Sequence, residues 1–213
     1  MIFMKIWEWF SLNIVSPINW SSLKALFNKG VYWELTELEH NKLRTLLAKD
    51  HYIILIRRKT HLTTYLISLG NYIRTGKLGY WSHALVNLED SVQTDFDYQL
   101  LESIGVGTKF SSFMQIFDCD SVCLLKPYCL NETEWTHAID QLRLQEGKPY
   151  DTVFKLADET KLSCCELVYE ALKNYIWKMP TFNRMIKEHH NQVTPDMFYN
   201  CKGDFEVVFE VRH

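Results

Sequence analysis

From residue 50 onward, the apolar positions fall into short runs with β-branched side chains and longer stretches with helical spacing. Residues 51–56 are predicted to form a buried strand, because a short apolar run is bounded there by a basic triplet. The same patterns predict strands over 80–88, 98–104, 122–125 and 205–211, and helices over 62–73, 132–144 and 164–177. A block of strands followed by a strong helix and a last strand is typical of an α+β domain and not of a doubly wound sheet.

The first 48 residues differ from the rest. Residues 1–48 are predicted to be a helical N-terminal extension on a main domain of residues 49–213. One helix is expected to start near Trp20, and a charged helix is expected to enter at 34–39 and run to Ala48. We expect the aromatic side chains of this extension to pack onto the main body, and a membrane-facing role is the less favoured alternative. These side chains are Trp7, Trp9, Phe10 and Trp20.

The composition is that of a globular protein, with 47% hydrophobic residues among 213 and only eight Gly and five Pro. The chain has 23 Lys and Arg against 26 Asp and Glu, a formal net charge of −3. A nucleic-acid partner is therefore not expected, because such binding depends on clustered cations that neutralise phosphates.

The sequence also predicts neither a signal peptide nor a transmembrane segment. Glu8 interrupts the apolar N-terminus, and no small-residue cleavage site follows it. No run of about 18 uncharged apolar residues is present, which is the length that a spanning helix needs. The six cysteines are irregularly spaced and two are adjacent, a pattern that fits a reduced compartment better than a disulfide scaffold.

The most informative stretch begins at Ser163. Ser163 and Glu166 have the spacing of a capping box, which places Cys164 in the first turn of the predicted helix. A thiol at this positive end of the helix dipole is stabilised as a thiolate. Helical spacing points Cys164 more squarely than Cys165 toward the protein body, where a base can meet it. The alternative is that both cysteines are small buried hydrophobic side chains.

A nucleophilic cysteine needs a base and a group that orients the base. His83 is the distinctive histidine, because a predicted strand would hold its ring rigidly, although a structural role is the more common one for such a residue. Glu102 falls on an otherwise apolar row of its predicted strand. Burial of a carboxylate there requires a partner such as a histidine ring, unless the strand lies at an edge that exposes it.

Four motifs occur in the order Tyr80-Trp-Ser-His-Ala-Leu85, Leu100-Leu-Glu-Ser-Ile-Gly-Val106, Tyr150-Asp151 ahead of Cys164-Cys-Glu-Leu-Val168, and Val193-Thr-Pro-Asp196. In this order they resemble the circularly permuted NlpC-type papain-like cysteine hydrolases of the YiiX-like group. The resemblance covers residues from about 50 to the end of the chain. It implies a papain-like antiparallel sheet packed on the helix that carries the nucleophile.

The resemblance assigns the nucleophile to Cys164, the base to His83 and the orienting carboxylate to Glu102. It implies a cysteine peptidase or amidase, without metal or cofactor, that cleaves an amide bond through a thioester, most often in a cell-wall peptide of peptidoglycan. Two positions depart from the group's pattern: Cys165 stands where Ser is usual, and Ser163 stands where an aromatic residue is often found. The N-terminal stretch resembles extensions on phage-encoded relatives, so the expected location is cytoplasmic or virion-associated.

Two other functions stay open at this point. Relatives of the permuted fold also act as lipid-directed acyl hydrolases or acyltransferases, and the aromatic N-terminus would bring such an enzyme to a membrane. A catalytically inactive binding module would have a thiol of ordinary reactivity. A zinc site is the least favoured alternative, because its ligands lack the paired spacing of structural zinc sites. Those ligands would be Cys119, Cys123, Cys129 and His137.

Overall fold

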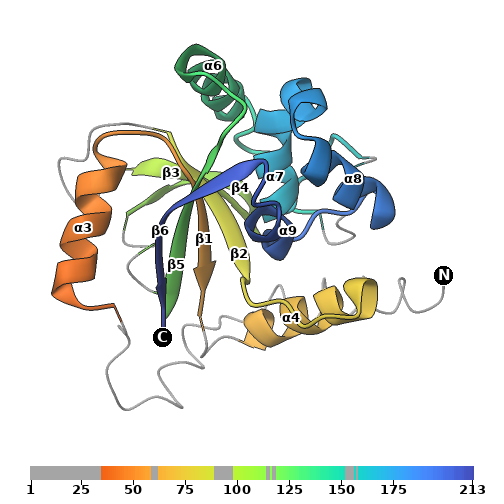
Figure 1. Cartoon of the computed structure of the whole chain (residues 1–213), viewed down its shortest axis with the longest axis horizontal. Helices are drawn as coiled ribbons and strands as arrows, with labels where there is room; N and C mark the ends of the chain where they lie inside the picture. The colour runs from red at the N-terminus through yellow and green to blue at the C-terminus, as the bar shows by residue number, and fades with distance from the viewer. Residues whose placement is uncertain are drawn as a thin grey trace.

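The chain folds around one six-stranded antiparallel sheet among the residues that the structure describes (Figure 1). The computed structural model describes residues 35–58, 62–88, 98–113, 119–151 and 158–213, together with residues 116 and 156. The strand order is β4-β3-β2-β1-β5-β6. The strands are β1 (Ile53–Arg57), β2 (His83–Asn87), β3 (Tyr98–Ile104), β4 (Gly107–Ser112), β5 (Ser121–Pro127) and β6 (Phe205–Arg212).

Helices cover both faces of this sheet, so the predicted α+β class is confirmed. Helix α3 lies on one side in Figure 1, and the helices from α6 to α9 lie on the other. The helices are α3 (Glu37–Leu47), α4 (Leu62–Thr75), α6 (Glu132–Arg143), α7 (Cys164–Leu172), α8 (Pro180–Glu188) and α9 (Pro195–Asn200), with a 3₁₀ helix over Lys173–Lys178.

The two faces of the sheet are buried in separate cores because side chains alternate along each strand. On β1, Ile53 and Leu55 pack in the core with α7, whereas Ile54 and Ile56 pack in the core with α3. The continuous apolar run that predicts this strand therefore reflects burial on both faces, which is expected for the strand at the centre of a covered sheet.

Three of the described helices begin with capping boxes, in which the residue before the helix and the third helical residue each bond the other's backbone N–H through their side chains. Thr36 and Glu39 cap α3, and Asn131 and Glu134 cap α6. Ser163 and Glu166 cap α7, as the sequence predicts. Each box satisfies backbone N–H groups that helix geometry leaves without acceptors.

The charged helix predicted to run to Ala48 is confirmed as α3, whose Leu43 and Leu47 are buried against the sheet. The helix expected near Trp20 and the aromatic residues of the N-terminus lie outside the described residues. No helix among the described parts of the chain combines the length and hydropathy needed to cross a bilayer.

Other elements differ from the prediction. The helix expected over 164–177 ends at Leu172 and continues as a 3₁₀ helix, and β4, α8 and α9 were not predicted. The chain reaches β4 through a turn at Gly105 and Val106. Gly107 has φ of +110°, and a Cβ there would lie 2.7 Å from the carbonyl oxygen of Lys148. Glycine is needed here because of both the backbone conformation and this close approach.

Candidate active site

The candidate site lies where β2 and β3 separate. These strands pair only at Val86–Leu101 and Asn87–Leu100. His83 lies on the part of β2 that does not pair with β3, and Glu102 lies on the part of β3 that does not pair with β2. Helix α7 contacts both strands, which brings Cys164 to the place where they separate. The hydroxyl of Ser103 on β3 donates to the carbonyl of Leu162, just before the helix.

His83 and Glu102 are in direct contact. The Nε2 atom of His83 lies 2.9 Å from Oε2 of Glu102. The hydroxyl of Ser111 on β4 donates to the other carboxylate oxygen over 2.5 Å. Glu102 is buried and not at an exposed edge, so the histidine partner accounts for a carboxylate on this apolar row.

The pKa values of the two groups move apart. Burial by itself lowers the pKa of His83, but hydrogen bonds and charges from Cys164 and Glu102 outweigh burial and raise it to about 9. Burial favours a higher pKa for Glu102, but the bonds from His83 and Ser111 and the charge of Arg58 lower it to about 2. His83 is therefore a cation, and Glu102 an anion, across the neutral range.

Cys164 is the third member of this arrangement and the first residue of α7. The Cys165 thiol, the His83 imidazole and the Ala84 backbone N–H all hydrogen-bond to its sulfur and hold its pKa well below the usual range, against the opposing effect of burial. The start of the helix adds a partial positive charge at the same point. The lowered pKa of Cys164 and the raised pKa of His83 both favour a thiolate–imidazolium pair.

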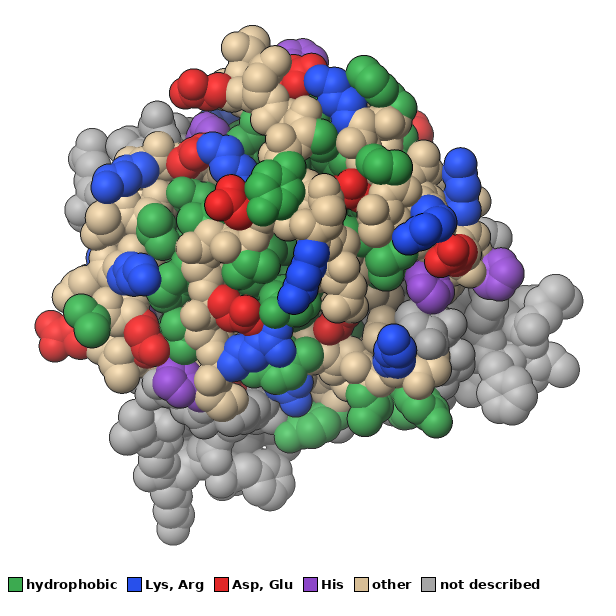
Figure 2. Space-filling model, in the orientation of Figure 1, with side chains coloured by type: hydrophobic (Ala, Val, Ile, Leu, Met, Phe, Trp, Pro, Cys, Tyr) green, Lys and Arg blue, Asp and Glu red, His purple; other side chains and the backbone are tan. Residues whose placement is uncertain are grey.

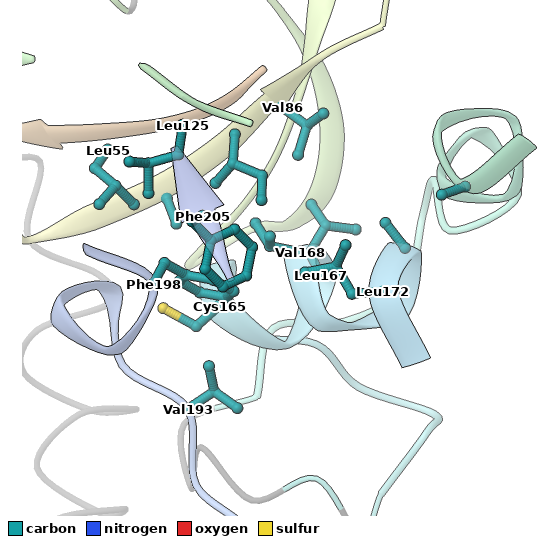
Figure 3. Packing of buried hydrophobic residues seen from close by; sticks show 14 of the residues in the cluster. Leu55, Val86, Leu125, Cys165, Leu167, Val168, Leu172, Val193, Phe198 and Phe205 are labelled. Carbon is teal, nitrogen blue, oxygen red and sulfur yellow. The ribbon is translucent and has the colours of Figure 1, made fainter. Parts of the chain in front are cut away.

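Cys165 is in a different environment. Figure 3 shows its sulfur among apolar side chains near Phe198 and Val193. Burial and the neighbouring Cys164 raise the pKa of the Cys165 thiol well above its usual range. The two sulfur atoms lie 3.9 Å apart. Both cysteines are buried, so interaction with His83, and not inward direction alone, distinguishes the Cys164 sulfur from that of Cys165.

We expect Cys165→Ala to reduce, without abolishing, the reactivity of Cys164. The variant loses one donor to the thiolate but keeps His83 and Ala84. A hydrogen bond to a charged group contributes about 1.5–3 kcal/mol, so the Cys164 pKa should rise by about one to two units. Iodoacetamide alkylation against pH, with the site located by mass spectrometry, measures this rise. An unchanged Cys164 pKa in Cys165→Ala would contradict the donor role.

A buried acid pair lies beneath the start of α7. Burial raises the pKa of Glu166 to about 8, and the neighbouring carboxyl of Asp151 adds to this effect, although the bonds from Ser163 oppose it. Glu166 accepts the Ser163 backbone N–H over 2.7 Å. With this raised pKa, Glu166 is mostly protonated at neutral pH, which limits the negative charge placed near Cys164.

Asp196, from the fourth motif, holds the segment that leads into β2. It lies at the start of α9, and its Oδ1 atom accepts the Tyr80 backbone N–H over 2.9 Å. The guanidinium groups of Arg57 and Arg212 lie 4.4 and 4.6 Å from the centre of the Tyr80 ring. These contacts hold the segment just before His83 in place.

Two contacts at the site were not predicted. Ser111 lies on the unpredicted strand β4, and its link to Glu102 follows from the register, in which Glu102 pairs with Lys109 and Leu100 with Ser111. The N–H of Ala84 reaches Cys164 because β3 does not pair with that part of β2. The pattern of side chains along the sequence predicts neither contact. The contact of Ser111 depends on how β3 pairs with β4, and the contact of Ala84 is made by a backbone N–H group.

The residues of the zinc alternative do not converge. Cys123 packs in the core with α7, whereas Cys119 packs in the core with α3 on the opposite face of the sheet. His137 is exposed on α6 and bonds the hydroxyl of Tyr175. Within the described ranges, no group of three or more His, Cys, Asp or Glu side chains is arranged to hold a metal ion.

Comparison with solved structures identifies a neighbour of the same fold. The metalloprotein YiiX from Escherichia coli O157:H7, of the domain of unknown function DUF1105, superposes with a TM-score of 0.54 at 14% sequence identity. The match covers 78% of this chain and 99% of YiiX, and the YiiX-like part of the predicted fold is thereby confirmed. No family model and no curated protein matches the chain. YiiX is described as a metalloprotein, whereas the described residues of this chain include no group of three or more side chains that could hold a metal ion.

Proposed function

We propose that this protein is a cysteine hydrolase that transfers an acyl group through Cys164. The observation that carries the proposal is the contact between a carboxylate, an imidazole and a thiol at the start of a helix. Each pKa is shifted in the direction that acyl transfer needs, toward thiolate for Cys164 and imidazolium for His83.

The reaction begins with Cys164 already ionised, so no proton has to be removed before attack. The Cys164 thiolate attacks the carbonyl carbon of an amide, and the electron pair of the carbonyl bond moves to oxygen. When the tetrahedral intermediate collapses, the carbon–nitrogen bond breaks and the His83 imidazolium gives its proton to the departing amine. The product of this half-reaction is a thioester on Cys164 and a neutral His83.

Water completes the cycle. Neutral His83 takes a proton from a water molecule as its oxygen attacks the thioester, and the carbon–sulfur bond breaks to release the acid and the thiolate. Glu102 stays ionised throughout, holds the imidazole in one orientation and stabilises its charged form. The charges after this step are those with which the cycle began.

The first turn of α7 supplies donors for the developing oxyanion. The backbone N–H groups of Cys164 and Cys165 are at helical positions without intrahelical acceptors. The capping box uses the N–H of Glu166 and leaves these two available. A well-placed oxyanion donor typically lowers the barrier by about 3 kcal/mol.

The fold proposed for this chemistry is a circularly permuted papain-like one. The chain order His83, Glu102, Cys164 and the packing of α7 on an antiparallel sheet support it. An amide in a cell-wall peptide is the proposed substrate, on the strength of the motifs that resemble the NlpC-type group. Lipid-directed acyl transfer uses the same three residues, so the substrate has to be decided by experiment.

An activated ester tests the proposal without knowledge of the natural substrate. We expect p-nitrophenyl acetate to give a burst of p-nitrophenol and an acetyl group on Cys164, located by mass spectrometry. Cys164→Ala should lose the burst and its acetyl adduct, because the remaining thiols lack the histidine. Cys129→Ser, which removes a partly exposed thiol elsewhere, is the matched control and should keep both.

Acetylation of wild type no faster than that of Cys164→Ala would refute an acyl-transfer site and leave a binding module as the function. A positive burst would justify a panel of peptidoglycan fragments and lipid esters, in which release of free amine distinguishes peptide cleavage from lipid hydrolysis.

A further inference from the structure

Among its described side chains, helix α4 buries polar groups and exposes large apolar ones. Its buried described side chains include Thr64 and Asn71, which are polar. Its outer surface carries Tyr65, Leu69 and Tyr72, which are 56%, 48% and 51% exposed. Helices on the surface of globular proteins normally turn their apolar stripe to the core.

Hydrogen bonds from three described polar side chains attach the inner side of α4. The hydroxyl of Thr64 donates to the carbonyl of Arg58, and that of Ser68 donates to the carbonyl of Gly79. The amide of Asn71 donates to the carbonyl of Lys77. These bonds join the helix to the segments on either side of it.

The exposed apolar side chains form one stripe. Tyr65, Leu69 and Tyr72 are spaced four and three residues apart, which places them on one helix face. Leu78 follows the helix and is 71% exposed. Figure 2 shows hydrophobic side chains gathered along the lower margin of the molecule, where Figure 1 places α4. We call these four residues the α4 stripe.

The chain around the α4 stripe is basic. Residues 57–79 contain five Lys and Arg and no Asp or Glu, in a chain whose net charge is −3. The five are Arg57, Arg58, Lys59, Arg74 and Lys77. This segment would repel a second copy of itself across a twofold interface, which argues against the α4 stripe as a dimer contact.

We propose that α4 is a membrane-docking helix that binds the surface of an anionic bilayer. Leucines beside tyrosines, on a segment of sequence that has basic residues and no acidic ones, suit the boundary between acyl chains and charged headgroups. The 14-residue helix is about 21 Å long, too short to span, and would lie in the plane of the interface. Since α4 leads into β2, docking would bring the His83 end of the sheet to the bilayer.

Vesicle sedimentation with the full chain tests this proposal. We expect wild type to sediment with vesicles of phosphatidylcholine and phosphatidylglycerol in equal parts, and much less with phosphatidylcholine alone. Leu69→Ser with Leu78→Ser should lower the partition coefficient by about tenfold or more, because two apolar side chains no longer enter the acyl boundary. Val106→Ser with Leu144→Ser removes exposed apolar side chains elsewhere and should bind like wild type.

Three results would overturn the proposal. Failure of wild type to sediment with anionic vesicles would show that α4 is not a membrane-binding surface. Wild-type binding by the α4 double variant would show that another part of the chain holds the membrane. A concentration-dependent dimer that the α4 variant loses, seen by ultracentrifugation without vesicles, would identify a second copy as the occupant. Cys164→Ala should bind as wild type does, so this test is independent of the proposed chemistry.

Discussion

Replacement of His83 by alanine is expected to lower the rate of Cys164 alkylation at about pH 6 by about 100-fold. The ordinary cysteine pKa is about 8.5, so less than about one thiol in 300 is ionised at that pH, whereas His83 keeps Cys164 as a thiolate in wild type. The gain in thiolate is partly offset because a thiolate of low pKa is intrinsically less nucleophilic. Iodoacetamide labelling followed by peptide mass spectrometry gives the rate for each cysteine.

The same pair predicts a pH profile. The pKa of Cys164 is lowered and that of His83 is raised to about 9, so wild-type alkylation should be flat across the neutral range. Ester or amide hydrolysis should fall above about pH 9, because His83 then lacks the proton that the leaving group needs.

Two further variants make the His83 result interpretable. His83→Gln can still donate to Glu102 but carries no charge, so it should show the same loss of reactivity without leaving the buried carboxylate unpartnered. His137→Ala removes an exposed histidine from α6 and should leave the rate unchanged. A wild-type rate in folded His83→Gln, or labelling that prefers Cys165, would show that the activated pair has been wrongly assigned.

Asn87→Leu is expected to lower the free energy of unfolding by about 3 kcal/mol. The Asn87 side chain is fully buried. Its oxygen accepts the Tyr52 N–H over 2.5 Å, and its nitrogen donates to the carbonyls of Asp50 and Leu47 over 2.8 and 3.5 Å. Leucine has a similar volume but leaves these backbone groups without that partner. Urea unfolding followed by circular dichroism measures the change.

Asn41→Leu provides the comparison for this stability effect. Asn41 is exposed on α3, close in sequence to the end that Asn87 holds, and it bonds the side chain of Arg44. Its replacement should change stability by less than about 0.5 kcal/mol. If Asn87→Leu were equally mild, the end of α3 would be held by apolar packing of Leu43 and Leu47 and not by the asparagine.

The sequence predicted those elements whose own residues carry the signal. Strand β1 is apolar on both faces, and the capping box of α7 is a local pattern of Ser163 and Glu166. Glu102 was identified because a carboxylate on an apolar row needs a partner, and the structure places His83 beside it. That the three candidate residues carry out catalysis stays a prediction.

The elements that the sequence did not predict owe their structure to contacts with other parts of the chain. Strand β4 has the sequence GTKFSS, with one large apolar residue, and it is a strand because β3 pairs along it. Helix α9 has six residues and is held by burial of Met197 and Phe198 and by the contacts of Asp196. Periodicity cannot identify an element this short, because too few residues repeat.

The candidate site, where β2 and β3 separate, also bears on how the protein folds. Its parts come from distant points in the chain, and the central strand β1 pairs on one side with β5, which follows it by more than sixty residues. Such long-range pairings form late and cooperatively, because closing the chain costs entropy before the contacts repay it. The histidine and the thiol would meet only once the sheet and α7 have assembled. We therefore expect a newly made or partly unfolded chain to carry an ordinary thiol, with the reactive thiolate appearing as the last sign of correct folding.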